Sequence, residues 1–170
     1  MNLSQTIRAI EKAAAMQPNV RTIVRNDVFR LNALPDVRYG VVAWLQGEHS
    51  TSADSQLAQY QFTLFYVDRL TEDKGNEVQI QSVGIETLEN ILRTLHDVGL
   101  FPAENYYFRT FNQRFSDECA GAFCTVHLET TKNGLCAAYY DLLSDASAFA
   151  LKKDGAGWKW VNNGQTTRII

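Results

Sequence analysis

A chain of 170 residues, of which 45% are hydrophobic and 21% charged, has the size and composition of one soluble globular domain and leaves hardly enough chain for a second. Its formal net charge of -3 disfavours a protein that grips nucleic acid over a broad face, because such a face is normally basic. No apolar run approaches the ~18 residues that cross a membrane, so no membrane partner is expected.

The first predicted element is a helix over residues 3–15. Asn2 and Gln5 have the spacing of a capping box, and a proline follows where the helix must end. Because Glu11 and Lys12 fall where a signal peptide would be apolar, the segment is expected to belong to the mature protein. Its apolar residues recur at helical spacing and form one stripe: Leu3, Ile7, Ile10 and Ala14.

Three strands are predicted before the second helix. Residues 20–32 are mixed in character, which indicates a strand with an Asn-Asp turn, and residues 37–49 are rich in β-branched and aromatic side chains. In YQFTLFYVDRL, residues 60–70, apolar and polar side chains alternate, which is typical of a strand with one buried face. Residues 47–56 have the composition of an exposed loop, and residues 71–77 that of a polar turn.

Residues 84–98 show the clearest helical pattern in the chain. At 100° per residue, six apolar side chains fall within an arc of roughly 140°, and the polar ones lie outside it. We therefore expect an amphipathic helix packed on a sheet, ended by Gly99. The apolar arc comprises Ile85, Leu88, Ile91, Leu92, Leu95 and Val98.

The remaining chain predicts further strands. Residues 105–115 and 122–131 read as two strands, antiparallel if joined directly through SDECAG, and the tail contains a hairpin with a turn at residues 154–155. The element order predicts an α+β fold, in which an N-terminal helix and a second amphipathic helix cover one face of a mostly antiparallel sheet. We expect one domain over residues 1–132 and a small C-terminal β extension over residues 133–170.

The stretch RFSDECAGAFCTVHLE, residues 114–129, resembles a metal or catalytic site because it gathers two cysteines, a histidine and carboxylates. Strand alternation argues against this, since it places Cys124 and His127 on opposite faces of a sheet. A catalytic cysteine needs a nearby histidine, and Cys119 instead lies next to two acidic residues. We predict no catalytic residues, no metal and no cofactor, and we expect free thiols in a reducing cytosol.

The aromatic segment NYYFRTF, residues 105–111, offers two interpretations. Strand alternation puts Tyr107, Arg109 and Phe111 on one face, and Tyr106 and Phe108 on the other. Either the sheet is buried on both faces, or another subunit covers one aromatic face, because Tyr, Phe and Arg are enriched at protein contacts. The candidates for a subunit interface are Tyr106, Phe108, Arg109, and the tryptophans Trp158 and Trp160 of the tail hairpin.

The order of the elements, together with the stretches FYVDRL, IQS and FSDECAGAF, resembles the tail-terminator family of tailed phages, particularly the versions in phages and prophages of Bacteroides-like hosts. The resemblance covers about residues 1–132. It implies a structural virion protein, without enzymatic activity, that forms a homo-oligomeric ring in the phage neck or tail. Such a ring ends the tail tube, meets neighbouring neck, tail or portal-proximal rings, and lets DNA pass through its lumen without sequence-specific binding.

For this chain, the resemblance implies assembly in the host cytoplasm and a final location in the virion. An acidic protein suits a DNA conduit because a neutral or negative lumen does not hold the passing phosphates. The polar segments 47–56 and 71–77 are the expected lumen or ring contacts. Their candidate residues are Glu48, His49, Asp54, Glu72, Asp73 and Lys74.

Two other functions stay open from the sequence. One is a small α+β enzyme with a pocket between the helix at 84–98 and the sheet, in which His127, Asp68 and Tyr66 would perform acid–base chemistry. A deep pocket with converging polar groups would favour it. The other is an interaction module of the host.

Overall fold

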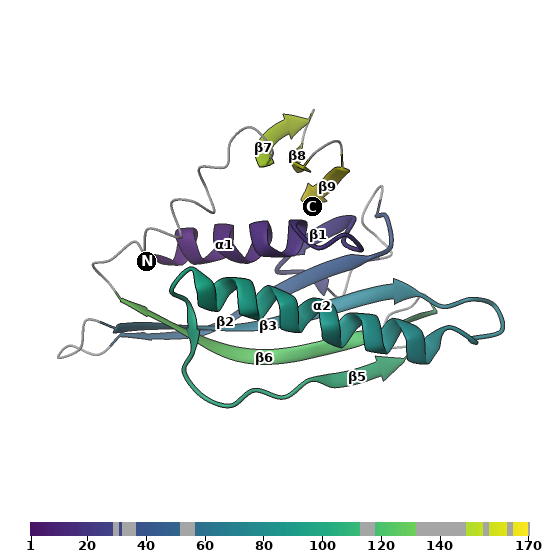
Figure 1. Ribbon diagram of the computed structural model, residues 1–170, viewed down its shortest axis with the longest axis horizontal. Helices are drawn as coiled ribbons and strands as arrows, with labels where there is room; N and C mark the ends of the chain where they lie inside the picture. The colour runs from purple at the N-terminus through teal and green to yellow at the C-terminus, as the bar shows by residue number, and fades with distance from the viewer. Residues whose placement is uncertain are drawn as a thin grey trace.

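The computed structural model describes residues 1–28, 31, 37–51, 57–112, 118–131, 149–154, 157–162 and 165–169. Over these residues the chain forms an α+β fold, as the sequence predicts (Figure 1). The elements, in chain order, are α1 (Leu3–Ala15), β1 (Thr22–Arg25), β2 (Val41–Thr51), β3 (Leu57–Arg69), α2 (Glu77–Asp97), β4 (Phe101–Pro102), β5 (Arg109–Asn112), β6 (Cys119–Thr131), β7 (Phe149–Asp154), β8 (Gly157–Asn162) and β9 (Gln165–Ile169).

The strands form one mixed, mostly antiparallel sheet in the order β4-β6-β3-β2-β1-β9-β8-β7, and β5 also pairs with β6. Strand β1 is the exception to the antiparallel pattern, because it runs parallel to both β2 and β9. The long strands β3 and β6 pair over their whole length, from Leu57 opposite Thr131 to Arg69 opposite Cys119. The C-terminal strands therefore continue the sheet beyond β1, with β7 as its last strand.

Helix α1 begins with the predicted capping box. The Gln5 backbone N–H donates to Asn2 Oδ1 at 2.9 Å, and the Asn2 backbone N–H donates to Gln5 Oε1 at 2.8 Å. The helix packs against α2 and β1 and is buried well beyond its apolar stripe. Its buried carboxylate, Glu11, receives two hydrogen bonds from the guanidinium of Arg25 on β1, one of them 2.7 Å between Nη2 and Oε2. This pairing offsets the cost of burying a charge.

Helix α2 covers the central strands, and it begins seven residues earlier than the pattern of residues 84–98 predicts. In its first turns Val78 is 76% exposed, but Ile80 is buried and Val83 packs against the core, so the apolar stripe begins before residue 84. The predicted arc faces the sheet: Leu88, Ile91, Leu92 and Leu95 are buried, and Ile85 is half-buried. Gly84 lets the helix approach closely, because a Cβ there would lie 3.2 Å from the Ala122 backbone nitrogen.

The sheet has a hydrophobic cluster on each face. The larger cluster lies between the sheet and the two helices. A smaller one lies on the opposite face, where Val28, Leu31, Val37 and Tyr39 pack over Phe65 and its neighbours. One end of the sheet is therefore buried on both faces within a single chain, which was one of the two alternatives for the aromatic segment.

Other predicted boundaries also differ from the structure. The exposed loop predicted for residues 47–56 is strand over residues 47–51, because β2 continues past an irregularity between Gln46 and His49 and stays paired with β3. The strand predicted for residues 105–115 is strand only at Arg109–Asn112. The predicted antiparallel pairing with the following strand is confirmed, with Arg109 opposite Phe123.

Candidate interaction surfaces

Cys124 and His127 of β6 lie on opposite faces of the sheet, as strand alternation predicts. Cys124 is buried in the larger cluster, and burial raises the pKa of its thiol to about 12. His127 is half-exposed on the other face, where its Nδ1 pairs with the carboxylate of Glu104. Cys119 is buried, and its Sγ lies 3.5 Å from the hydroxyl of Tyr39. Among the described residues, no group of three or more His, Cys, Asp or Glu side chains could hold a metal ion.

Of the three candidates for acid–base chemistry, Tyr66 and Asp68 lie together, but His127 lies far from both. The Tyr66 hydroxyl donates to Asp68 Oδ2 at 3.4 Å, and both residues lie on the helix face. Burial, and then the charge of Asp68, raise the pKa of Tyr66 to about 12. His127 lies on the opposite face, five residues along β6 from Ala122, the residue opposite Tyr66. Strand geometry makes that separation roughly 17 Å, too far for a shared proton transfer.

The aromatic segment contributes to both faces and to solvent. Tyr106 and Phe108 are half-buried against the larger cluster, and their rings make an edge-to-face contact with centroids 5.6 Å apart. Phe111 is buried in the smaller cluster. Among the exposed side chains of the segment are Tyr107, which is 74% exposed, and Arg109. These two are therefore accessible for contact with another protein.

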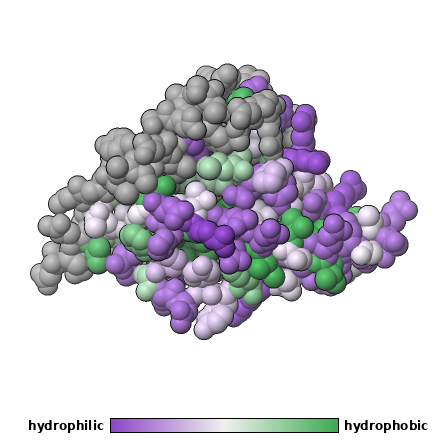
Figure 2. All heavy atoms as spheres, in the orientation of Figure 1, coloured by the Kyte–Doolittle hydropathy of each residue, from purple (hydrophilic) through white to green (hydrophobic). Residues whose placement is uncertain are grey.

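Tyr107 was not singled out as an interface candidate, although strand alternation placed it on the same face as Arg109. Residues 105–108 are not strand, yet the predicted faces hold: Tyr106 and Phe108 pack against the larger cluster, whereas Tyr107 and Arg109 are exposed on the other side. Trp158 and Trp160 lie on β8, opposite Ile169 and Thr167 of β9, but their side chains fall outside the described part of the chain. Figure 2 shows that hydrophobic residues on the face formed by α2 and β5 are dispersed among polar ones.

The turn between β3 and α2 projects from one end of the molecule (Figure 1). Its own side chains hold its shape: the Thr71 backbone N–H donates to Asn76 Oδ1 at 2.9 Å, and the Thr71 hydroxyl donates to Asp73 Oδ1 at 2.6 Å. The bond from Thr71 and another from a backbone N–H lower the pKa of Asp73. The three predicted contact residues of the turn, Glu72, Asp73 and Lys74, are all exposed.

The other predicted contact residues lie at the opposite end. Glu48 and His49 are exposed on the last part of β2, beside the first residues of β3, and Asp54 lies outside the described residues. The projecting turn follows the last residue of β3. Because His49 is opposite Tyr60 and nine residue steps of β3 lie between Tyr60 and Arg69, the two sets of candidates are separated by roughly 30 Å along the strand. The structure thus gives the chain two polar ends, joined by its longest strands.

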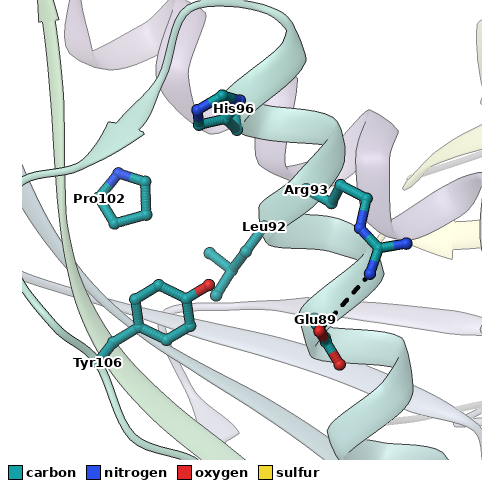
Figure 3. Close-up of a pocket in the computed structure, with 6 residues that line it drawn as sticks. All are labelled: Glu89, Leu92, Arg93, His96, Pro102 and Tyr106. Carbon is teal, nitrogen blue, oxygen red and sulfur yellow. Dashed lines mark ion pairs between the residues drawn. The ribbon is translucent and has the colours of Figure 1, made fainter.

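A small pocket lies beside α2 rather than beneath it (Figure 3). The space between α2 and the sheet is filled by the larger hydrophobic cluster. The pocket has a volume of about 190 Å³ and opens between the outer side of α2 and residues 102–106. The six residues that line it are Glu89, Leu92, Arg93, His96, Pro102 and Tyr106.

No model of a protein family matches the sequence, and no curated protein matches it. Neither helix that the structure describes is long and apolar enough to cross a membrane.

Proposed function

We propose that the chain is a structural subunit of a ring in the neck or tail of a phage particle, where it ends the tail or joins it to the head connector and surrounds the DNA channel. The resemblance of residues 1–132 to tail-terminator proteins supports this function. The structural observation that favours it most is the separation of two polar, exposed contact regions to the opposite ends of β3. A subunit stacked between two other rings needs one contact surface at each end.

Contacts within the ring would use the edges of the sheet. The strands β4 and β5 lie on one side of β6, and β7 is the last strand on the far side of the sheet. Contact between two different edges is head-to-tail, and such contacts form a closed ring when the rotation between successive subunits closes. At the β5 edge, Arg109 and Tyr107 are exposed. The β7–β8 hairpin with its two tryptophans is the proposed opposite surface.

The charge of the chain fits passage of DNA rather than its retention. With a formal net charge of -3, a ring of such subunits would carry excess negative charge. A negative lumen repels phosphates and does not bind them, so DNA moves through without specific contacts. The partners proposed are copies of this chain and the rings above and below it.

Charge reversal at each end tests this function. We expect Glu72→Lys to weaken docking to one neighbouring ring and Glu48→Lys to weaken docking to the other, because each change replaces an attractive charge at the proposed contact with a repulsive one. The measurement is complementation of particle assembly, followed by imaging of the incomplete particles. Glu86→Lys is the matched control, because Glu86 is exposed on α2, away from both ends. Full assembly with both variants would contradict the proposed stacking, and turnover of a small molecule by a free monomer would replace it with the enzyme alternative.

A further inference from the structure

Residues 103–105, which follow β4 directly, are attached to the rest of the molecule through His127. The Ala103 backbone N–H donates to the carbonyl oxygen of His127 at 2.7 Å, and the Glu104 carboxylate pairs with Nδ1 of the same histidine. In the described part of the chain, these three residues make no other hydrogen bond or ion pair. One residue of β6 therefore holds them with both its main chain and its ring.

Packing does little to fix these residues. All three are exposed, and they border an open cavity of about 810 Å³. Pro102 and Tyr106 on either side of them are half-buried, and both also line the pocket beside α2 (Figure 3). Residues 103–105 are thus the loosely packed part of one wall of that pocket, and the cavity gives them room to move.

The groups that face His127 are neutral or acidic. On its own strand, Glu129 lies two residues away and on the same face. On β3 the neutral Gln61 lies directly opposite, and β4 has no charged residue. Tyr107 and Arg109 are exposed on this side too, but the register partner of Arg109 lies four residues along β6, roughly 13 Å away. A proton on His127 therefore meets two carboxylates, one of which the ring contacts.

We propose that His127 and Glu104 form a pH-sensitive latch that fixes residues 103–105 when the ring of His127 is protonated. Histidine is the side chain whose charge ordinarily changes between pH 5 and 8. A protonated ring makes a charge-assisted hydrogen bond to the carboxylate, which is stronger than a neutral one. A neutral ring keeps this contact only as the tautomer with hydrogen on Nδ1, and without attraction between opposite charges. As the pH rises, the latch weakens and this part of the pocket wall becomes free to shift.

Solvent-exchange NMR of the full chain at pH 5.5 and pH 8.0 tests the latch through the backbone amide of Ala103. After correction for the intrinsic pH dependence of exchange, the protection of this amide should be about two- to fivefold lower at pH 8.0, the effect of one partly exposed ion pair. Glu104→Gln should remove this difference, because the new side chain carries no charge. His127→Gln should remove it as well, although this variant keeps the main-chain oxygen that accepts from Ala103.

Glu86→Gln is the matched control, because it makes the same change at an exposed carboxylate on α2, across the sheet from His127. This variant should keep the full difference between the two pH values. Equal or higher protection at pH 8.0 in the unchanged protein overturns the proposal. So does a difference that persists in Glu104→Gln, since another group would then cause it.

Discussion

Gly121 on β6 shows how tightly individual residues are packed between the two central strands. A Cβ at this position would lie 1.9 Å from the Tyr66 carbonyl oxygen and 2.8 Å from Cζ of Phe111. Neither contact is with the free end of a flexible side chain, because one atom is backbone and the other belongs to a buried ring. Relief of the clash would require the sheet itself to move.

We therefore expect Gly121→Ala to lower the free energy of unfolding by about 3 kcal/mol, at the upper part of the range for overpacked cores. The matched variant is Gly75→Ala, because Gly75 is exposed and its nearest neighbour is the Asp73 side chain at 3.2 Å. Gly75→Ala should alter the free energy of unfolding by no more than about 0.5 kcal/mol. Urea unfolding of both variants measures the difference, and equal stability of the two would contradict the packing at Gly121.

Two buried groups predict loss of stability at high pH. Burial raises the pKa of Cys124 from 9.0 and that of Tyr66 from 10.0, each to about 12. The folded state therefore holds these protons more tightly than the unfolded state, so the stability that they contribute is complete below pH 9 and falls as the pH rises through about 12. Urea unfolding at pH 7.5 and pH 10.5 should show the decrease. In the Cys124→Ala variant, stability should fall less between these two pH values than in the unchanged protein. An identical decrease in the variant and the unchanged protein would rule out a role for Cys124.

At the scale of elements, α2 contributes most through the face that contacts β3 and β6. Leu88→Ala should lower the free energy of unfolding by roughly 2–5 kcal/mol, as truncation of buried leucines does. Glu89→Ala changes the adjacent residue, which is exposed, and should have almost no effect. Chemical denaturation compares the two. A similar loss in both would mean that the helix presents a different face to the sheet.

The elements that the sequence predicts well carry their signal locally. The capping box of α1, the apolar arc of α2 and the alternation of β6 depend on neighbouring residues, and the structure confirms all three. The first turns of α2 extend its apolar stripe through Ile80 and Val83, but Val78 is exposed and the residues between them are polar, so the helical pattern is weaker there. The parallel contact between β1 and β9 joins residues 22–23 to residues 168–169, and no local pattern encodes a pairing over that distance.

Some features of the candidate surfaces could likewise be predicted from the local sequence, and others could not. The exposed turn at residues 71–76 could be predicted from its polar composition, and so could the separation of Cys124 from His127. The pocket beside α2 could not, because it forms where Tyr106 and Pro102 meet a helix that ends several residues earlier. The exposure of Tyr107 was also missed, because alternation predicts the face of a side chain but not what covers it: Phe111, on the same face, is buried and Tyr107 is exposed.

At the scale of the whole molecule, the C-terminal strands belong to the same sheet as the rest of the chain. Ile169 on β9 lies in the larger hydrophobic cluster at 6% exposure, and the Thr167 hydroxyl donates to the Val20 carbonyl at 3.3 Å. We expect Ile169→Ala to lower stability by roughly 2–5 kcal/mol and to shift a single cooperative transition. Thr166→Ala on the same strand is the exposed control. Two separate transitions in calorimetry would show that the C-terminal strands unfold independently.

The ring proposal is tested most directly by electron cryo-microscopy of the native particle that contains this chain. The proposal predicts a closed ring of identical subunits around the DNA channel, with β5 of one subunit facing the β7–β8 hairpin of the next. The turn at residues 71–76 and the end of β2 near His49 should contact different neighbouring rings. A particle in which the chain is absent from the neck and tail, or is present as isolated copies with one polar end facing solvent, would contradict the proposal.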